Sequence, residues 1–164
     1  MTVDWVVRDA TDADVSSIVR FGRAHIREHY APLIGVRAAE EQVTKWWSPE
    51  SIAGPVSAGL VVVAELDGRI VGVAQRGRSG ADHAVYKLYV DPAVRGRGLG
   101  VVLLDAVIAR LPVDASRLWI EHFAANERAG AFYEREGFTV ERVEPHSGGD
   151  PALAVVWRSR DLST

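Results

Sequence analysis

The chain has 164 residues, 48% of them hydrophobic and 25% charged, which is the composition of one globular domain with a core of its own. Its formal net charge of −3 argues against a general binder of nucleic acid or membranes, because such proteins are basic. The absence of cysteine excludes disulfides, thiolate metal sites and a cysteine nucleophile.

The distribution of apolar residues along the sequence indicates where in the cell the protein is expected. The first eight residues lack the basic and apolar regions of a signal peptide. No apolar run approaches the ~20 residues that a membrane span needs, and we find no repeat or internal linker. We therefore expect a single domain over residues 1–164, in the cytoplasm.

The hydrophobic pattern of the first half predicts a strand, two helices and then three strands. Thr11 or Asp12 can cap the first helix, and Asp67-Gly68 has the chemistry of a tight hairpin. We expect loops at residues 48–59 and 76–83, which contain proline, serine or glycine. The predicted elements are a strand at residues 3–8, helices at 13–30 and 37–47, and strands at 60–66, 70–75 and 84–90.

The hydrophobic pattern of the second half predicts two further helices, each followed by a strand or strands. Pro112 stops the first of these helices, and Gly137 ends the second. The predicted elements are helices at 99–111 and 126–136 and strands at 117–123, 138–144 and 152–158. The order β-α-α-β-β-β-α-β-α-β-β contains two β-α-β crossovers, so we expect an α/β (α+β) fold with a mixed sheet flanked by helices.

One segment suggests a phosphate-binding turn. Residues 88–100 read Leu-Tyr-Val-Asp-Pro-Ala-Val-Arg-Gly-Arg-Gly-Leu-Gly, between a predicted strand and a predicted helix. Glycine lets the backbone approach a ligand closely, and the unpaired N–H groups at a helix N-terminus bind anions. Arg95 and Arg97 add local positive charge. The order of strand, glycine-rich turn and helix is therefore suited to binding a pyrophosphate.

Two known phosphate-binding patterns fit the turn poorly. A Walker A loop needs Gly-Lys-Ser/Thr, whereas Val101 and Val102 follow Gly100. A Rossmann turn needs G-x-G-x-x-G directly after the strand, but its third glycine would fall at Val101 and the turn is too long. Glu121 does lie roughly where a ribose-binding acid would fall in that fold.

A third pattern is Arg-x-x-Gly-x-Gly, at Arg95, Gly98 and Gly100. About 20 residues after it come a strand, an asparagine, a helix with alanine and tyrosine, and Gly-Phe. These matching residues are Asn126, Ala129, Tyr133, Gly137 and Phe138. Together the two halves resemble the GCN5-related N-acetyltransferase (GNAT) superfamily, which binds acetyl-coenzyme A. The resemblance implies a centrally splayed mixed sheet and covers the whole chain, most strongly between residues 84 and 138.

The resemblance also implies roles for single residues. Backbone groups of Leu88 and Val90 are expected to pair with the pantetheine arm like an extra strand. The N–H groups across Arg95–Gly100 are expected to hold the pyrophosphate, and Asn126 to reach the coenzyme's arm. The coenzyme-binding residues that it implies are Leu88, Tyr89, Val90, Arg95, Gly96, Arg97, Gly98, Leu99, Gly100, Asn126 and Tyr133.

Acetyl transfer to a primary amine needs an acid and a base. An N–H donor at Val90 would stabilise the tetrahedral oxyanion, and the resemblance places Tyr133 near the sulfur, where its phenol can protonate the leaving thiolate. The alternative is that Tyr133 only packs in the core. Without cysteine, direct attack in a ternary complex is favoured over a covalent acyl-enzyme.

Glu121 is the first candidate for the base that deprotonates the amine. The segment Leu-Trp-Ile-Glu resembles the one in ribosomal-protein alanine acetyltransferases where a glutamate is the base. The alternative is a solvated or ion-paired carboxylate. His122 ranks second because it points to the opposite face of the strand, and His83 and His146 lie in predicted loops.

Other functions remain open. A non-catalytic coenzyme A or acyl-CoA sensor would use the same turn. His25-Ile-Arg-Glu28-His29 matches a zinc-hydrolase pattern, H-x-x-E-H, without an evident third ligand, so we expect no metal. The first two helices usually form the acceptor wall in the superfamily, so we expect pocket residues at His25, His29, Tyr30, Trp46 and Trp47. The acceptor is expected to be a small-molecule or peptide amine. An exposed pair at Trp46 and Trp47 would favour a homodimer.

Overall fold

The structure is a computed structural model that describes residues 4–163. The chain divides into two compact units, which we describe separately. The first unit comprises residues 1–76 and 87–110, and the second comprises residues 77–86 and 111–164. In the part of the chain that is described, no helix is both long and apolar enough to cross a membrane.

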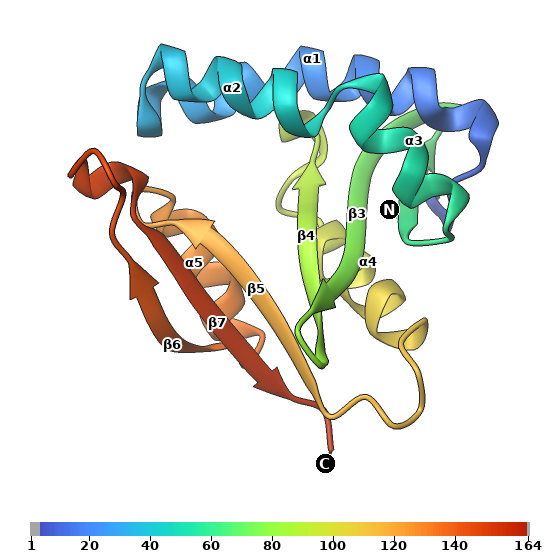
Figure 1. The fold of residues 1–164 in the computed structure, drawn as a ribbon. Coiled ribbons are helices and arrows are strands. Elements are labelled where there is room, and N and C mark those ends of the chain that lie inside the picture. The colour runs from blue at the N-terminus through green and yellow to red at the C-terminus, as the bar shows by residue number, and fades with distance from the viewer. Residues whose placement is uncertain (1–3, 164) are drawn as a thin grey trace. The chain divides into compact units, whose positions relative to one another are not determined.

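The first unit contains a small antiparallel sheet and four helices (Figure 1). Strand β2 pairs with β1 and with β3, for example through Val63 opposite Arg8 and Val73. The bounds are β1 Val6–Asp9, α1 Val15–Ile34, α2 Val36–Trp46, α3 Pro49–Ser57, β2 Val61–Leu66, β3 Arg69–Ser79, β4 Asp82–Val90 and α4 Leu99–Ala109, with short 3-10 turns at Asp12–Asp14 and Pro92–Val94. The last three residues of β3, 77–79, and the start of β4, 82–86, belong to the second unit.

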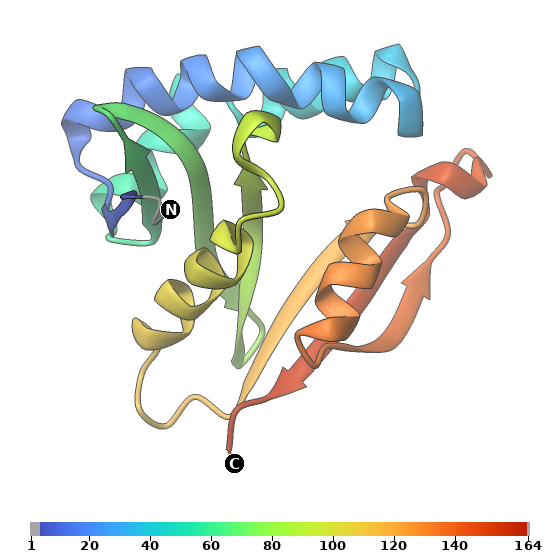
Figure 2. The same cartoon turned by 180° about the vertical axis from the view of Figure 1, so that it is seen from behind.

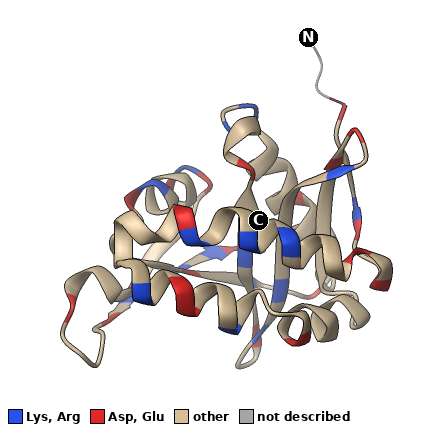
Figure 3. Cartoon of the chain, turned by 90° about the horizontal axis from the view of Figure 1, so that it is seen from above, with Lys and Arg blue, Asp and Glu red and all other residues tan. Residues whose placement is uncertain are grey.

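Two layers of helix cover this sheet. Side chains of α1, α2 and α3 form one core with alternate residues of β2 and β3, such as Val61, Val63 and Val73. The other face of β3 meets α4, since a Cβ on Gly72 would lie 2.8 Å from Leu103 Cδ1 (Figure 2). Lysines and arginines are interspersed with acidic residues along the helices (Figure 3), as expected from a net charge near zero.

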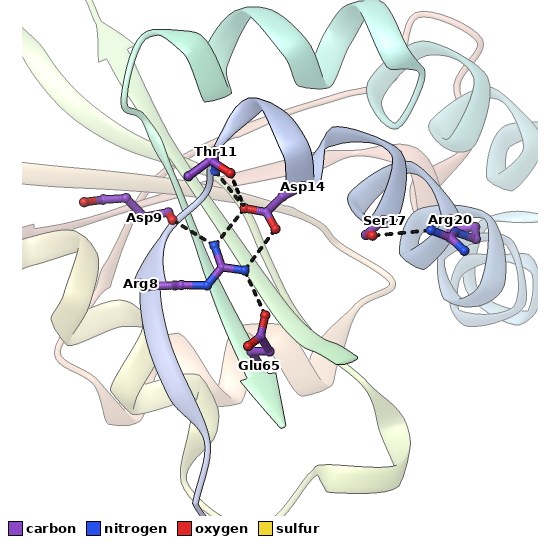
Figure 4. A network of polar contacts seen from close by, with 7 residues as sticks. All are labelled: Arg8, Asp9, Thr11, Asp14, Ser17, Arg20 and Glu65. Atoms are coloured by element: carbon purple, nitrogen blue, oxygen red, sulfur yellow. Dashed lines mark hydrogen bonds and ion pairs between the residues drawn. The ribbon is translucent and has the colours of Figure 1, made fainter. Parts of the chain in front are cut away.

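A charged network anchors β1 to its surroundings (Figure 4). The Arg8 guanidinium donates to both carboxylate oxygens of Asp14, at 2.7 and 2.9 Å, and to Glu65 at 2.8 Å. Asp14 also accepts the backbone N–H of Thr11 at 2.7 Å, which ties the turn before α1 into the same network. The hydrogen bonds from Arg8 lower the pKa of Asp14 to about 2, so the carboxylate stays charged under ordinary conditions.

The second unit is a sheet with one helix against it. Strand β5 runs parallel to β4, with His83 opposite Leu118, and antiparallel to β7, with Glu121 opposite Trp157. Strand β6 pairs with the other edge of β7. Helix α5 covers one face of β5 and β7 (Figure 2), where a Cβ on Gly130 would lie 3.1 Å from the His122 ring. The bounds are β5 Arg117–Phe123, α5 Glu127–Arg135, β6 Thr139–Glu144 and β7 Val155–Asp161, with a 3-10 turn at Pro151–Leu153.

The strand order β1-β2-β3-β4-β5-β7-β6 defines a mixed seven-stranded sheet, and the described residues form five α-helices. The predicted fold class is therefore confirmed. Both predicted crossovers are present, because β4 and β5 are parallel and β5 and β6 are each antiparallel to β7.

Several local predictions were wrong. The predicted order lacks α3, because the dipeptide Ser48-Pro49 is typical of a loop. Ser48 instead caps the helix, accepting the Ser51 N–H at 3.2 Å, and Pro49 occupies the first helical position, where its missing N–H is harmless. Residues 76–83 are also strand rather than loop, apart from a tight turn at Gly80, whose φ is +60°. Helix α1 continues past Pro32 to Ile34, so the proline lacks its hydrogen bond to the preceding turn without ending the helix.

We expect the substitution Gly22→Ala in α1 to destabilise the protein. Alanine normally favours a helix by ~1 kcal/mol over glycine, but here its Cβ would lie 2.7 Å from Trp47 Cε3 and 2.8 Å from two further atoms of that side chain. Since Trp47 is buried, we expect a net loss of about 1–3 kcal/mol in urea denaturation. Gly54→Ala in α3 is the matched control, because a Cβ there meets nothing within 4 Å. Equal stability of the two variants would contradict this account of the core.

Candidate active site

The glycine-rich turn of the first unit has the geometry of an anion site. Strand β4 ends at Val90, and the Asp91 side chain accepts the Ala93 N–H at 2.9 Å to form the next turn. Gly96 and Gly98 have φ of +80° and +83°, and a Cβ on either meets nothing within 4 Å. Helix α4 follows at once, and its first hydrogen bond joins Val102 N to Gly98 O at 3.2 Å. The N–H groups of residues 99–101 therefore have no carbonyl partner one turn earlier in the helix. They are free to bind a ligand.

The two arginines of the turn have different surroundings. Arg95 is half-buried: its Nε donates to Val90 O at 3.2 Å, and its guanidinium lies 5.1 Å from the centre of the Tyr89 ring. Arg97 is exposed. The Arg95 side chain therefore stabilises the end of β4 by a hydrogen bond. The Arg97 side chain extends from the turn into solvent.

Tyr89 is buried at the centre of an aromatic group from α1. Its ring stacks on His25 at 6.2 Å and meets Phe21 and His29 edge-on at 5.8 and 5.2 Å. Burial raises the pKa of the Tyr89 phenol, and the charge of Arg95 opposes that rise. With 7% of the residue exposed, this side chain belongs to the core, so the coenzyme contact predicted for Tyr89 would have to be a backbone contact.

The zinc-hydrolase interpretation gains no geometric support. His25 Nε2 lies 3.6 Å from Asp91 Oδ2, whereas the His29 ring packs on Tyr30 and Tyr89. Among residues 4–163, no three His, Cys, Asp or Glu side chains are grouped to hold a metal ion.

The tryptophans of α2 do not form the exposed pair that would favour a homodimer. Trp46 is 55% exposed, but Trp47 is 5% exposed and belongs to the core of α1–α3. The exposure on which that argument for a homodimer depends is absent at Trp47, because the end of α2 turns the second ring inward.

In the second unit Glu121 lies on the face of β5 that α5 does not cover, opposite Trp157 on β7. Desolvation by the surrounding protein raises the pKa of its carboxyl, and the neighbouring charge of Glu144 adds to the rise, while Arg142 opposes it. The side chain still reaches solvent. A solvent-accessible carboxylate with a raised pKa is chemically suited to accept a proton.

His122 points the other way along the strand, as predicted, and both of its ring nitrogens are occupied. Its Nδ1 lies 2.9 Å from Phe123 O, and Arg158 Nε donates to its Nε2 at 3.0 Å. Desolvation lowers the pKa of the ring, which favours its neutral form. Of the two remaining histidines, His83 contacts Arg78 at 3.0 Å and His146 is exposed on a turn.

Tyr133 and Asn126 lie on and before α5. The Tyr133 ring is 7% exposed and contacts the rings of His122, Phe132 and Phe138. Asn126 is 6% exposed, and its Oδ1 accepts the Ala129 N–H at 3.3 Å, so it caps α5. The packing and capping roles are thus present in the structure, while the coenzyme contacts of both residues stay predictions.

The sequence pattern missed one side chain with unusual surroundings, Lys87 on β4. Its ammonium is half-buried and donates to Gln75 Oε1 at 2.8 Å. The amino-acid composition could have indicated this residue, because lysine is rare in the chain. Of the 19 basic residues, only Lys45 and Lys87 are lysines.

Comparisons with known proteins bear on the family to which this chain belongs. A family model described as an acetyltransferase (GNAT) domain matches residues 57–140, just over half of the chain. A mycothiol acetyltransferase of Propionibacterium freudenreichii is 34% identical over 79% of this chain and 41% of its own length. An uncharacterized N-acetyltransferase of Mycobacterium tuberculosis is 33% identical over 57% of this chain and 70% of its own length. The chain thus spans about two fifths of the first of these relatives.

A solved structure shows the same fold. The PaiA N-acetyltransferase from Thermoplasma acidophilum, crystallised in complex with coenzyme A, has a TM-score of 0.79 with this chain. The match covers 97% of this chain and 99% of that one at 17% identity. On the family model and the sequence relatives together, this chain belongs to the GNAT superfamily of acetyltransferases.

Proposed function

We propose that this chain is an acetyl-coenzyme A-dependent N-acetyltransferase that transfers an acetyl group to a primary amine by direct attack in a ternary complex. The observation that carries this proposal is the turn between β4 and α4. It offers open glycines of positive φ at Gly96 and Gly98 and unsatisfied N–H groups at a helix start. The structural relative crystallised with coenzyme A supports the same ligand class.

In the proposed reaction the amine nitrogen attacks the thioester carbonyl, the C–N bond forms and the C–S bond breaks. Glu121 takes the proton of the amine, because its raised pKa makes it a better base than an ordinary carboxylate. Tyr133 gives its proton to the leaving thiolate. The N–H groups at the start of α4 bind the pyrophosphate, and the end of β4 positions the pantetheine arm.

A non-catalytic sensor of coenzyme A or acyl-CoA is the second candidate. It would use the same turn and would need neither acid nor base. The raised pKa of Glu121 favours the enzyme, since a binding module has no use for a proton acceptor there. Acetyl transfer to any amine, measured by free-thiol release, would eliminate the sensor.

We expect acetyl-coenzyme A to stabilise the protein in a thermal-shift titration, because a ligand that binds only the native state raises its stability with concentration. NAD and zinc are the comparison ligands. Gly98→Glu is expected to abolish the shift, since it fills the turn with a side chain and a negative charge. Gly59→Glu is the matched control, because Gly59 also has positive φ, +73°, and open surroundings. A shift with NAD or zinc alone, or equal shifts in both variants, would contradict the proposal.

We expect Tyr133→Phe to lower kcat by about 10²-fold or more, because the thiolate loses its proton donor. The fold and the affinity for acetyl-coenzyme A are expected to change little, since phenylalanine keeps the ring contacts with His122, Phe132 and Phe138. Phe132→Leu, next to it on the same helix, controls for altered packing. A Tyr133→Phe enzyme with full rate would limit Tyr133 to a packing role.

The raised pKa of Glu121 predicts the pH dependence of the rate. The carboxylate is the base, so kcat is expected to fall as pH drops through that raised pKa, above the range of an ordinary glutamate. In Glu121→Gln this acidic limb is expected to disappear together with most of the activity, measured from pH 4 to 9 at saturating substrates. Glu144→Gln keeps the base but removes a neighbouring negative charge, so its limb is expected to move to lower pH. An unchanged limb in Glu121→Gln would rule out Glu121 as the base.

A further inference from the structure

Lys87 stands apart from the other basic residues of the chain. Seventeen of the 19 basic residues are arginines, and the other lysine, Lys45, is exposed on α2. Lys87 is half-buried in the part of β4 that belongs to the first unit, directly before Leu88. The environment of its ammonium is therefore not that of an ordinary surface lysine.

The partners of this ammonium are neutral. Its Nζ donates to Gln75 Oε1 at 2.8 Å and lies 5.6 Å from the centre of the Trp47 ring. Among the described residues of the first unit, no carboxylate forms an ion pair with it. An amide oxygen and an aromatic face stabilise a cation, but they leave its charge uncompensated.

Desolvation lowers the pKa of Lys87 to about 8, so the side chain is still mostly protonated at neutral pH. The first unit thus holds a half-buried positive charge that an anion would stabilise. The Gln75 carboxamide uses its oxygen toward Lys87 and retains its N–H groups as further donors. The ring of Trp47, which is buried in the core of α1–α3, lies beside the ammonium.

We propose that Lys87, Gln75 and Trp47 form an anion subsite for the acceptor, and that the acceptor is therefore a primary amine that also carries a carboxylate. This inference rests on the proposed function. The pyrophosphate of the coenzyme is assigned to the turn after β4, and the pantetheine arm expected beside Leu88–Val90 carries no charge. One ammonium matches one carboxylate, which an acceptor of this kind would supply.

The direct test is the pKa of Lys87 in the presence of a carboxylate. Reductive ¹³C-methylation labels two lysines and the chain N-terminus, and Lys45→Arg and Lys87→Arg assign the NMR signals. We expect 4-aminobutanoate to raise the pKa of Lys87 above about 8, because a bound anion favours the ammonium. 4-Aminobutanamide is expected to leave it unchanged, and Lys45 is expected to respond to neither. An unmoved Lys87 signal at saturating 4-aminobutanoate would overturn the subsite.

The kinetic test compares the same two amines as acceptors, since the distant carboxylate barely alters the basicity of the amine. We expect kcat/KM to favour the carboxylate by about 10-fold or more, as for hydrogen bonds to charged groups. Lys87→Met is expected to remove this preference and Lys87→Arg to keep part of it, while Lys45→Met changes nothing. Equal losses in Lys87→Met and Lys87→Arg would mean that proton release, and not charge, is what matters, and would overturn the subsite.

Failure of this inference can be told from failure of the proposed function. Binding of acetyl-coenzyme A by wild type and by Lys87→Met is measured separately by thermal shift. If neither variant binds the coenzyme, the proposed function fails, whereas the NMR titration still decides whether Lys87 binds a carboxylate. If both bind it and the acceptor preference is absent, only the subsite fails.

Discussion

The burial of one aromatic ring, that of Tyr89, holds together the parts of the first unit on which the proposed chemistry depends. Phe21, His25 and His29 of α1 contact the ring, and the guanidinium of Arg95 lies over it. Arg95 in turn donates to the last carbonyl of β4. Helix α1, the end of β4 and the start of the glycine-rich turn are thus one packed group, and displacing any of them would expose the ring to water.

In the second unit, strand alternation separates two neighbouring titratable groups. Glu121 and His122 are adjacent in sequence, but they face opposite sides of β5. His122 is fixed between Phe123 O and Arg158 beneath α5, whereas Glu121 faces the side that α5 leaves open. One residue therefore stabilises the helix–sheet contact, and its neighbour is left exposed to solvent, where the proposed proton transfer would need it.

Much of the fold could be predicted because its signals are local. Strand 117–123 has the predicted bounds, and the positive-φ glycines lie where the turn after β4 required them. Helix α3 was missed because Ser48 and Pro49 serve a turn and a helix start equally well, and only the contacts of the following residues decide between them. Lys87 was missed because its environment is made by Gln75 and Trp47, which are distant in sequence.

The division of the chain has a consequence for its biosynthesis. Every residue of the first unit lies before position 111, and only the hairpin of residues 77–86 interrupts it. A chain emerging from the ribosome therefore presents the complete sequence of the glycine-rich turn, the Tyr89 group and the helices that pack on them while residues 111–164 are still being translated. Vectorial synthesis lets the first unit begin to fold before β5, β6 and β7 can compete for its strand edges.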